Sequence, residues 1–207
     1  MRLGLVLVAA LLVLGAAAPP PGVDLDRVLA EAPAPRLSDY RLFIGTDAAR
    51  PSPGVVPYEL ATPLFTDYAE KSRWVFTPPG RKIGYNDHGA LDFPVGAVLV
   101  KTFAYPADLR RPGQDARKVE TRLLIRKSSG WTAQTYVWNA DGTEAVLKRA
   151  GARLPVTFTD LQGRRVDLDY AVPNQNQCKT CHQLDGAITP IGPKVRNLNR
   201  RIVLAGG

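Results

Sequence analysis

The chain has 207 residues, which is enough for one domain of ordinary size. Its 27 lysines and arginines exceed its 19 aspartates and glutamates, for a net charge of +8. That balance favours an acidic redox protein or an anionic membrane surface as a partner, or else a basic surface that is only solvated. The sequence has two cysteines, Cys178 and Cys181, and both lie in one short motif, which excludes a structural disulfide framework.

The first 18 residues have the pattern of a secretory signal peptide. Arg2 precedes an apolar run from Leu3 to Leu14, and Ala16 to Ala18 form a small-residue cleavage site. This run is shorter than the roughly 20 apolar residues of a membrane-spanning helix, and we expect no transmembrane span in the mature chain. We therefore predict a protein that is periplasmic or otherwise exported through a cleaved signal peptide, for which nucleic acid is not an expected partner.

Residues 19–35 are predicted to form a proline-rich lead-in that contains a short helix. Apolar residues recur at helical spacing over Val23–Ala32, and Pro33 then breaks the pattern. The lead-in is therefore expected to precede the main domain.

Residues 36–172 contain short apolar runs, rich in β-branched and aromatic residues and separated by proline and glycine. Turn signals at 128–130 and 139–142 predict a three-strand meander over 119–148. We expect a mainly β domain, a sandwich or distorted barrel of short antiparallel strands, rather than a βαβ fold. The predicted strands are 55–60, 72–77, 81–86, 97–105, 119–127, 131–138, 143–148, 155–159 and 165–170.

The most informative motif lies near the end of the chain. Residues 178–182 read C-x-x-C-H, the attachment signature of a c-type haem. On one helical turn, positions i, i+3 and i+4 share a face, so Cys178, Cys181 and His182 would project toward one ligand. The cysteines would form thioether bonds to one covalent haem c, and His182 would be the proximal ligand of its iron. Residues 173–207 are therefore predicted to be a short helical and loop segment that binds haem.

Three other sites could use the same cysteines. A structural zinc site usually needs four Cys or His ligands, and His88 is the one histidine outside the motif. A thioredoxin-like dithiol is expected near a βαβ pattern, whereas loop-like residues 173–177 precede Cys178. An inert local disulfide is the third alternative. The sequence favours haem over all three.

The segment after the motif offers a second contact for the proximal histidine. Ile191–Leu198 resembles the Gly-Pro-x-Leu segment that follows C-x-x-C-H in class I cytochromes c. That resemblance implies that the carbonyl of Pro193 accepts the ring proton of His182, as such contacts commonly orient metal-bound histidines. The alternative is that Pro193 only shapes a turn.

The sixth position of the iron is less clearly marked. Met1 is the one methionine and would leave with the signal peptide, which excludes a thioether of the mature chain as the distal ligand. His88, within a predicted turn at 86–89, remains a candidate distal ligand. A lysine such as Lys194, a side chain of a partner, or an open position are the alternatives.

Several longer motifs extend over nearly all of the chain that follows the signal peptide, and they include Leu37–Phe43, Val56–Lys71, Leu91–Gly96, Glu120–Leu124, Thr135–Asn139 and Val172–Cys178. Together they resemble a family of exported dihaem c-type cytochromes. The resemblance implies a redox protein, but family members continue into a second region with another C-x-x-C-H, which this chain lacks. One haem is therefore implied here, and a shortened form of a longer dihaem protein is one explanation of the missing second motif.

These observations predict a c-type cytochrome-like protein that transfers electrons to or from a partner protein, more an electron carrier than a catalyst. One alternative is a haem enzyme or sensor with an open distal site. Another is a non-redox β-sandwich binding domain with a vestigial haem tail. The short segment after His182 cannot enclose a haem alone, so the β domain or another subunit would have to complete the pocket.

Overall fold

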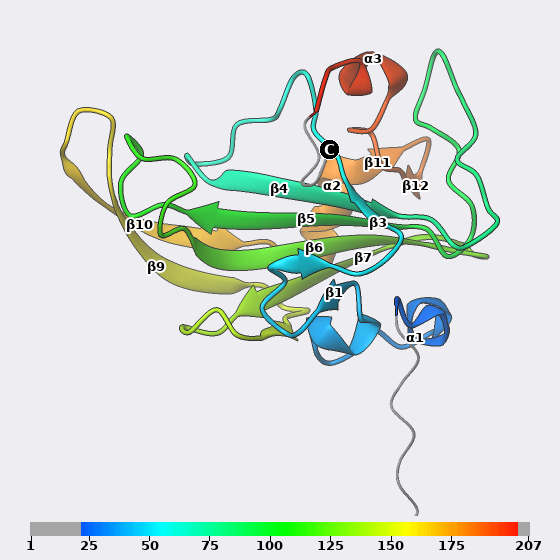
Figure 1. Cartoon of the computed structure of the whole chain (residues 1–207), viewed down its shortest axis with the longest axis horizontal. Helices are drawn as coiled ribbons and strands as arrows, with labels where there is room; N and C mark the ends of the chain where they lie inside the picture. The colour runs from blue at the N-terminus through cyan, green and yellow to red at the C-terminus, as the bar shows by residue number, and fades with distance from the viewer. Residues whose placement is uncertain (1–21, 203–207) are drawn as a thin grey trace, which may run out of the picture.

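The computed structural model describes residues 22–202, which form a mainly β fold around one six-stranded antiparallel sheet (Figure 1). Each strand pairs with the next along the chain, so the sheet is a meander. The expected mainly β class is confirmed, and the sheet stays open rather than closing into a barrel. Its strands in order are β3 (Val55–Pro57), β4 (Glu70–Phe76), β5 (Val98–Tyr105), β6 (Arg117–Lys127), β7 (Gly130–Trp138) and β8 (Ala145–Leu147).

The strand predictions hold where the alternating pattern is long. The predicted meander over 119–148 corresponds to β6, β7 and β8. The predicted strand at 81–86 is reduced to an isolated bridge between Gly84 and Asp92. This stretch lies in the long connection between β4 and β5, where no strand runs beside it to supply a continuous ladder.

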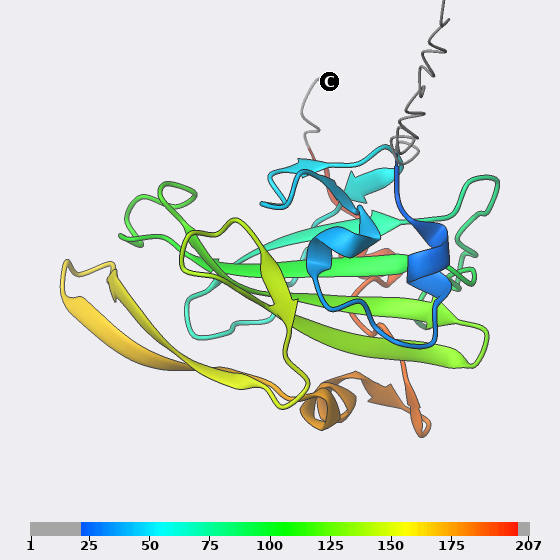
Figure 2. The ribbon, with the colours of Figure 1, turned by 90° about the horizontal axis from the view of Figure 1, so that it is seen from below.

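One face of the sheet is covered by the N-terminal segments (Figure 2). The short helix α1 (Leu25–Leu29) begins at Asp24, whose side chain accepts the backbone N–H of Arg27 at 2.9 Å. The buried Val28 of α1 belongs to a core that also contains Val100 and Tyr136 of the sheet. The predicted helix is thus present but shorter than Val23–Ala32. After α1 come the 3₁₀ turn η1 (Leu37–Tyr40), β1 (Phe43–Ile44) and β2 (Arg50–Pro51).

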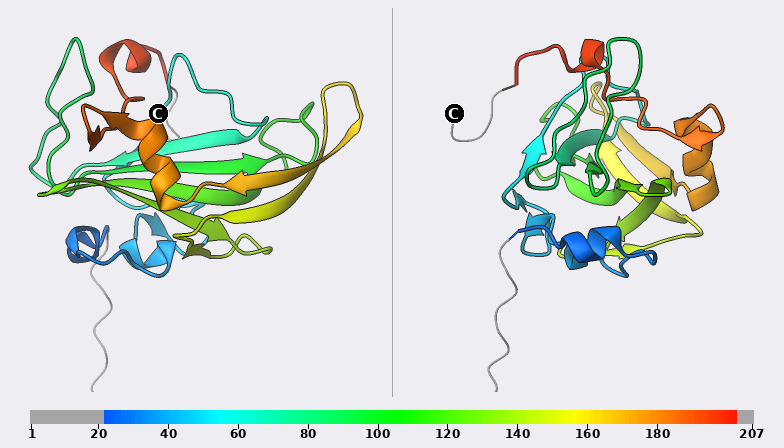
Figure 3. Two further views of the ribbon diagram at one scale, coloured as in Figure 1. Left: turned by 180° about the vertical axis from the view of Figure 1, so that it is seen from behind. Right: turned by 90° about the vertical axis from the view of Figure 1, so that its right-hand side faces the viewer.

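The C-terminal segments cover the opposite face. The helix α2 (Gln175–His182) packs against β7, as Figure 3 shows, and Cys178 lies next to Thr135 of that strand. Because successive residues of a strand point to opposite faces, Thr135 and the neighbouring Tyr136 place α2 and α1 on opposite sides of the sheet. The other C-terminal elements are the hairpin strands β9 (Ala152–Thr159) and β10 (Arg165–Val172), then β11 (Gln183–Leu184), β12 (Ala187–Ile188) and α3 (Val195–Leu198).

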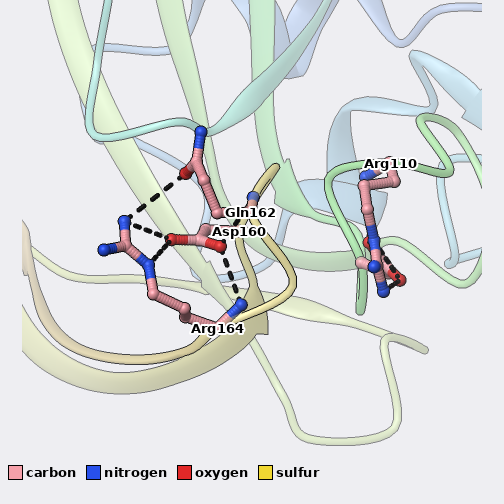
Figure 4. A network of polar contacts seen from close by, with 5 residues as sticks. Arg110, Asp160, Gln162 and Arg164 are labelled. Carbon is pink, nitrogen blue, oxygen red and sulfur yellow. Dashed lines mark hydrogen bonds and ion pairs between the residues drawn. The ribbon is translucent and has the colours of Figure 1, made fainter.

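The β9–β10 hairpin leads directly into α2, and Asp160 holds the turn at its other end (Figure 4). One carboxylate oxygen accepts the backbone N–H groups of Gln162 at 2.9 Å and Arg164 at 2.8 Å, and the other accepts Nε of Arg164 at 2.9 Å. These bonds lower the pKa of Asp160, with the Arg164 backbone as the largest cause. The turn at the end of the hairpin far from α2 is thus closed by side-chain hydrogen bonds.

Within residues 22–202, no helix is long and apolar enough to cross a membrane. The predicted signal peptide at 1–18 lies outside the described residues.

Candidate functional site

The motif lies on a helix that begins just before it. The side chain of Asn174 accepts the backbone N–H of Gln177 at 2.9 Å, and the side chain of Gln177 accepts the backbone N–H of Asn174 at 2.9 Å. This reciprocal cap satisfies two free donors at the start of α2. Cys178, Cys181 and His182 therefore occupy positions i, i+3 and i+4 of one helix, as the spacing predicts.

All three motif side chains line one cavity of about 360 Å³ between α2 and the sheet. A volume of this size is typical of small-molecule and cofactor sites. Much of the remaining wall is apolar and comes from several strands and from the segment after β12. Its apolar members include Leu60, Leu99, Leu123, Leu124, Ala133 and Pro190.

The two cysteines are both free thiols in different surroundings. Cys178 is buried, and its sulfur lies 3.9 Å from Oγ1 of Thr135. Burial raises the pKa of the Cys178 thiol. Cys181 is exposed while still lining the cavity. The thiol of Cys178 thus lies against the sheet, and the thiol of Cys181 is exposed to solvent.

The imidazole of His182 is partly buried and lies near two cations of the sheet. Burial lowers its pKa, and the charges of Lys101 and Arg122 act in the same direction. A contact between the ring and the backbone of Thr189 raises the pKa by a smaller amount, while the buried Nδ1 makes no hydrogen bond of full geometry. The neutral ring is the form that ligates metals. An orphaned ring nitrogen in a cavity is an uncommon and costly feature, which is consistent with a ligand-binding role.

Pro193 lines the same cavity but does not contact the histidine as the resemblance to class I cytochromes c implies. Its carbonyl accepts the backbone N–H of Leu91 at 3.5 Å, while Nδ1 of His182 remains unpartnered. The physical reason is that this carbonyl joins the C-terminal segment to the loop before β5. The predicted hydrogen bond between Pro193 and His182 is not formed in this structure.

His88 lies apart from the cavity. Its side chain is 93% exposed, and Nε2 lies 3.4 Å from the carboxylate of Asp87. The backbone N–H groups of His88 and Gly89 donate to Oδ1 of Asn86, which forms the expected turn. The structure therefore brings Cys178, Cys181, His182 and Pro193 together, whereas neither His88 nor Lys194 is among the residues that line the cavity.

Sequence reasoning missed the polar floor of the cavity. Arg73, Lys101 and Arg122 line it from β4, β5 and β6. Burial, followed by the charges of Arg73 and Arg122, lowers the pKa of Lys101 to about 8. The sequence did contain a sign that Lys101 is buried. Lys101 alternates with the apolar residues Leu99 and Phe103, so it lies on the buried face of a central strand.

Tyr58 is a further cavity residue that the sequence did not mark. Burial raises its pKa to about 12, against the smaller opposite effect of Arg73. The phenol is therefore neutral at physiological pH, and it adds a polar group to a wall that is otherwise largely apolar.

Across residues 22–202, no group of three or more His, Cys, Asp or Glu side chains is arranged to hold a metal ion. Comparison with protein-family models, curated proteins and solved structures finds no match to this chain.

Proposed function

We propose that this chain binds one haem c covalently and transfers electrons to or from a partner protein. The observation that carries this proposal is the convergence of Cys178, Cys181 and His182 on one largely apolar cavity. The donor set fits the group: two free thiols, and a neutral imidazole with an orphaned ring nitrogen. A bound haem would supply one-electron exchange, at a potential set by its axial ligands and surroundings.

Each residue of the site has a distinct role in this proposal. Cys178 and Cys181 would hold the porphyrin edge, and His182 would be the proximal iron ligand. The leucines and Ala133 of the cavity wall would exclude water. Because Cys181 is exposed, one edge of the group would face solvent, where a partner could approach. The net charge of +8 favours an acidic redox protein as that partner.

Export to the periplasm belongs to the same proposal. The signal-like pattern at residues 1–18 and the resemblance to exported dihaem cytochromes support it. Both agree with an oxidising compartment outside the cytoplasm, where c-type haem attachment is expected.

Production of the full chain in a host with active cytochrome c maturation tests the proposal. We expect a coloured protein whose haem stays attached through acid-acetone extraction and whose mass is increased by one haem. A colourless product with free or merely bridged thiols at Cys178 and Cys181 would refute it.

A haem sensor or enzyme with an open distal site is the second candidate. The observation that favours it is that His182 is the one histidine among the described cavity residues, which include no methionine. Two other cavity residues, Lys101 and Tyr58, carry a nitrogen or oxygen atom that could act as the distal ligand. Rapid carbon monoxide binding to the reduced protein would support this candidate, because an open position accepts the gas. A six-coordinate spectrum that carbon monoxide leaves unchanged would support the electron carrier.

A further inference from the structure

We propose that Arg73, Lys101 and Arg122 form a carboxylate-binding row that holds the two propionate groups of the haem. This inference rests on the proposed function, and it assigns the sheet side of the cavity. The row runs from Arg122, which pairs with the Thr135 that contacts Cys178, to Arg73 two strands away. Nothing in the C-x-x-C-H motif specifies these three cations.

The row is a direct result of strand register. Arg73 of β4 pairs with Lys101 of β5, and Lys101 pairs with Arg122 of β6. Residues that are directly opposite on adjacent antiparallel strands project to the same face, and the strands are about 4.8 Å apart. All three side chains line the cavity. Three positive charges therefore lie side by side on its floor.

The row has more positive charge than its surroundings neutralise. Glu120 binds Arg122 through two contacts, Nη2–Oε1 at 2.5 Å and Nε–Oε2 at 3.0 Å. The same carboxylate also accepts a hydrogen bond from the hydroxyl of Tyr170. Among the described residues, no carboxylate lies within ion-pair distance of Arg73 or Lys101. Two cations of the row thus form no direct ion pair, and the Lys101 ammonium lies over the Phe103 ring, 4.7 Å from its centroid.

Arg73 is the strongest sign that a ligand is needed. The residue is only 8% exposed, and Nη2 of its guanidinium is buried without a hydrogen-bond partner. Nη1 makes one long contact, 3.4 Å to the backbone carbonyl of Lys71. A buried, unpaired guanidinium nitrogen is costly, and like charges on directly opposite residues add repulsion. A bound carboxylate would pair with the guanidinium nitrogen and would also reduce the repulsion between the neighbouring cations.

The chemistry of the row matches carboxylates in particular. Arginine presents a planar fork of donors that pairs with both oxygens of a carboxylate. Haem has a largely apolar ring with two propionates on one edge. On the sheet side of the cavity, the apolar pair Leu99 and Leu124 likewise lies directly beside the row of cations. The Arg73 end of the row, two strands away from Arg122, would therefore orient the ring edge that the cysteines do not hold.

Substitution of Arg73 in the haem-loaded protein tests the inference. The measurement is the pH dependence of the reduction potential, which reports the pKa of the propionates. A cation in contact lowers a carboxyl pKa by about 1 to 3 units, so Arg73→Gln should raise the propionate pKa by about 1 unit or more. Arg73→Lys keeps the charge and should restore most of the wild-type value.

Lys71→Gln is the matched control. Lys71 lies on the same strand and face as Arg73 and carries the same charge, but it does not line the cavity. We expect Lys71→Gln to raise the propionate pKa by much less than Arg73→Gln does, because Lys71 would not contact the propionates. Arg122 is not a suitable first target, because its loss would leave the buried Glu120 unpaired.

Three results would overturn the inference. Equal shifts in Arg73→Gln and Lys71→Gln, or no shift in either, would show that the propionates do not contact Arg73, while covalent haem binding would stand. Calorimetric binding of succinate to the haem-loaded protein, lost in Arg73→Gln, would assign the row to a separate anionic ligand. Failure of haem to attach to the wild-type chain would remove the proposed function itself.

Discussion

Replacing both Cys178 and Cys181 with alanine is expected to abolish covalent haem retention. These are the two cysteines of the sequence, and both line the cavity on α2, so no other thiol can form a thioether. Each single variant should keep one attachment point and therefore a reduced yield of covalent haem. Intact mass and haem staining after denaturing electrophoresis measure the result. Haem that survives denaturation in the double variant would contradict the assignment.

Thr180→Ala is the matched control for these variants. Thr180 is exposed on the same helix between the two cysteines, so the substitution should change the free energy of unfolding by no more than about 0.5 kcal/mol. Haem retention should be unchanged.

A pair of histidine variants separates the axial role from attachment. His182→Ala should keep the thioethers but lose the proximal bond, with a changed absorption spectrum. His88→Ala removes a side chain that is 93% exposed and is not among the residues that line the cavity, so we expect the wild-type spectrum. A spectral change in His88→Ala would instead identify it as a distal ligand.

Glu120→Gln is expected to lower the free energy of unfolding by about 3 to 5 kcal/mol. Glu120 is 0% exposed, pairs with Arg122, and accepts a hydrogen bond from Tyr170. Glutamine keeps the volume but removes the charge, so the Arg122 guanidinium would stay in a row of cations without its carboxylate. Breaking a buried ion pair by removal of one partner has a cost of this size. Urea denaturation followed by circular dichroism measures it.

Asp169→Asn is the exposed counterpart. The pair between Arg153 and Asp169 has a distance of 3.0 Å, and the two side chains are 70% and 66% exposed. An ion pair in water contributes about 0 to 1 kcal/mol, so this variant should be nearly as stable as the wild type. If Asp169→Asn and Glu120→Gln lowered the free energy of unfolding by similar amounts, burial of Glu120 would not be the cause of its large effect.

The sequence by itself determined the features that depend on neighbouring residues. Alternating apolar residues and turn signals specify the meander of β6, β7 and β8, because side-chain alternation and turn chemistry act over a few residues. The spacing of Cys178, Cys181 and His182 likewise specifies one helical face. By contrast, the two-residue strands β1, β2, β11 and β12 are too short to show a pattern, since each is defined by its pairing partner.

Only the tertiary structure decided what surrounds the motif. Arg73, Lys101 and Arg122 come from three strands and meet through long-range register, which no local spacing encodes. The carbonyl of Pro193 meets Leu91 rather than His182 because the C-terminal segment packs on a distant loop. Local residue chemistry names the groups that could bind a ligand, whereas strand pairing and loop packing determine which of them share a cavity.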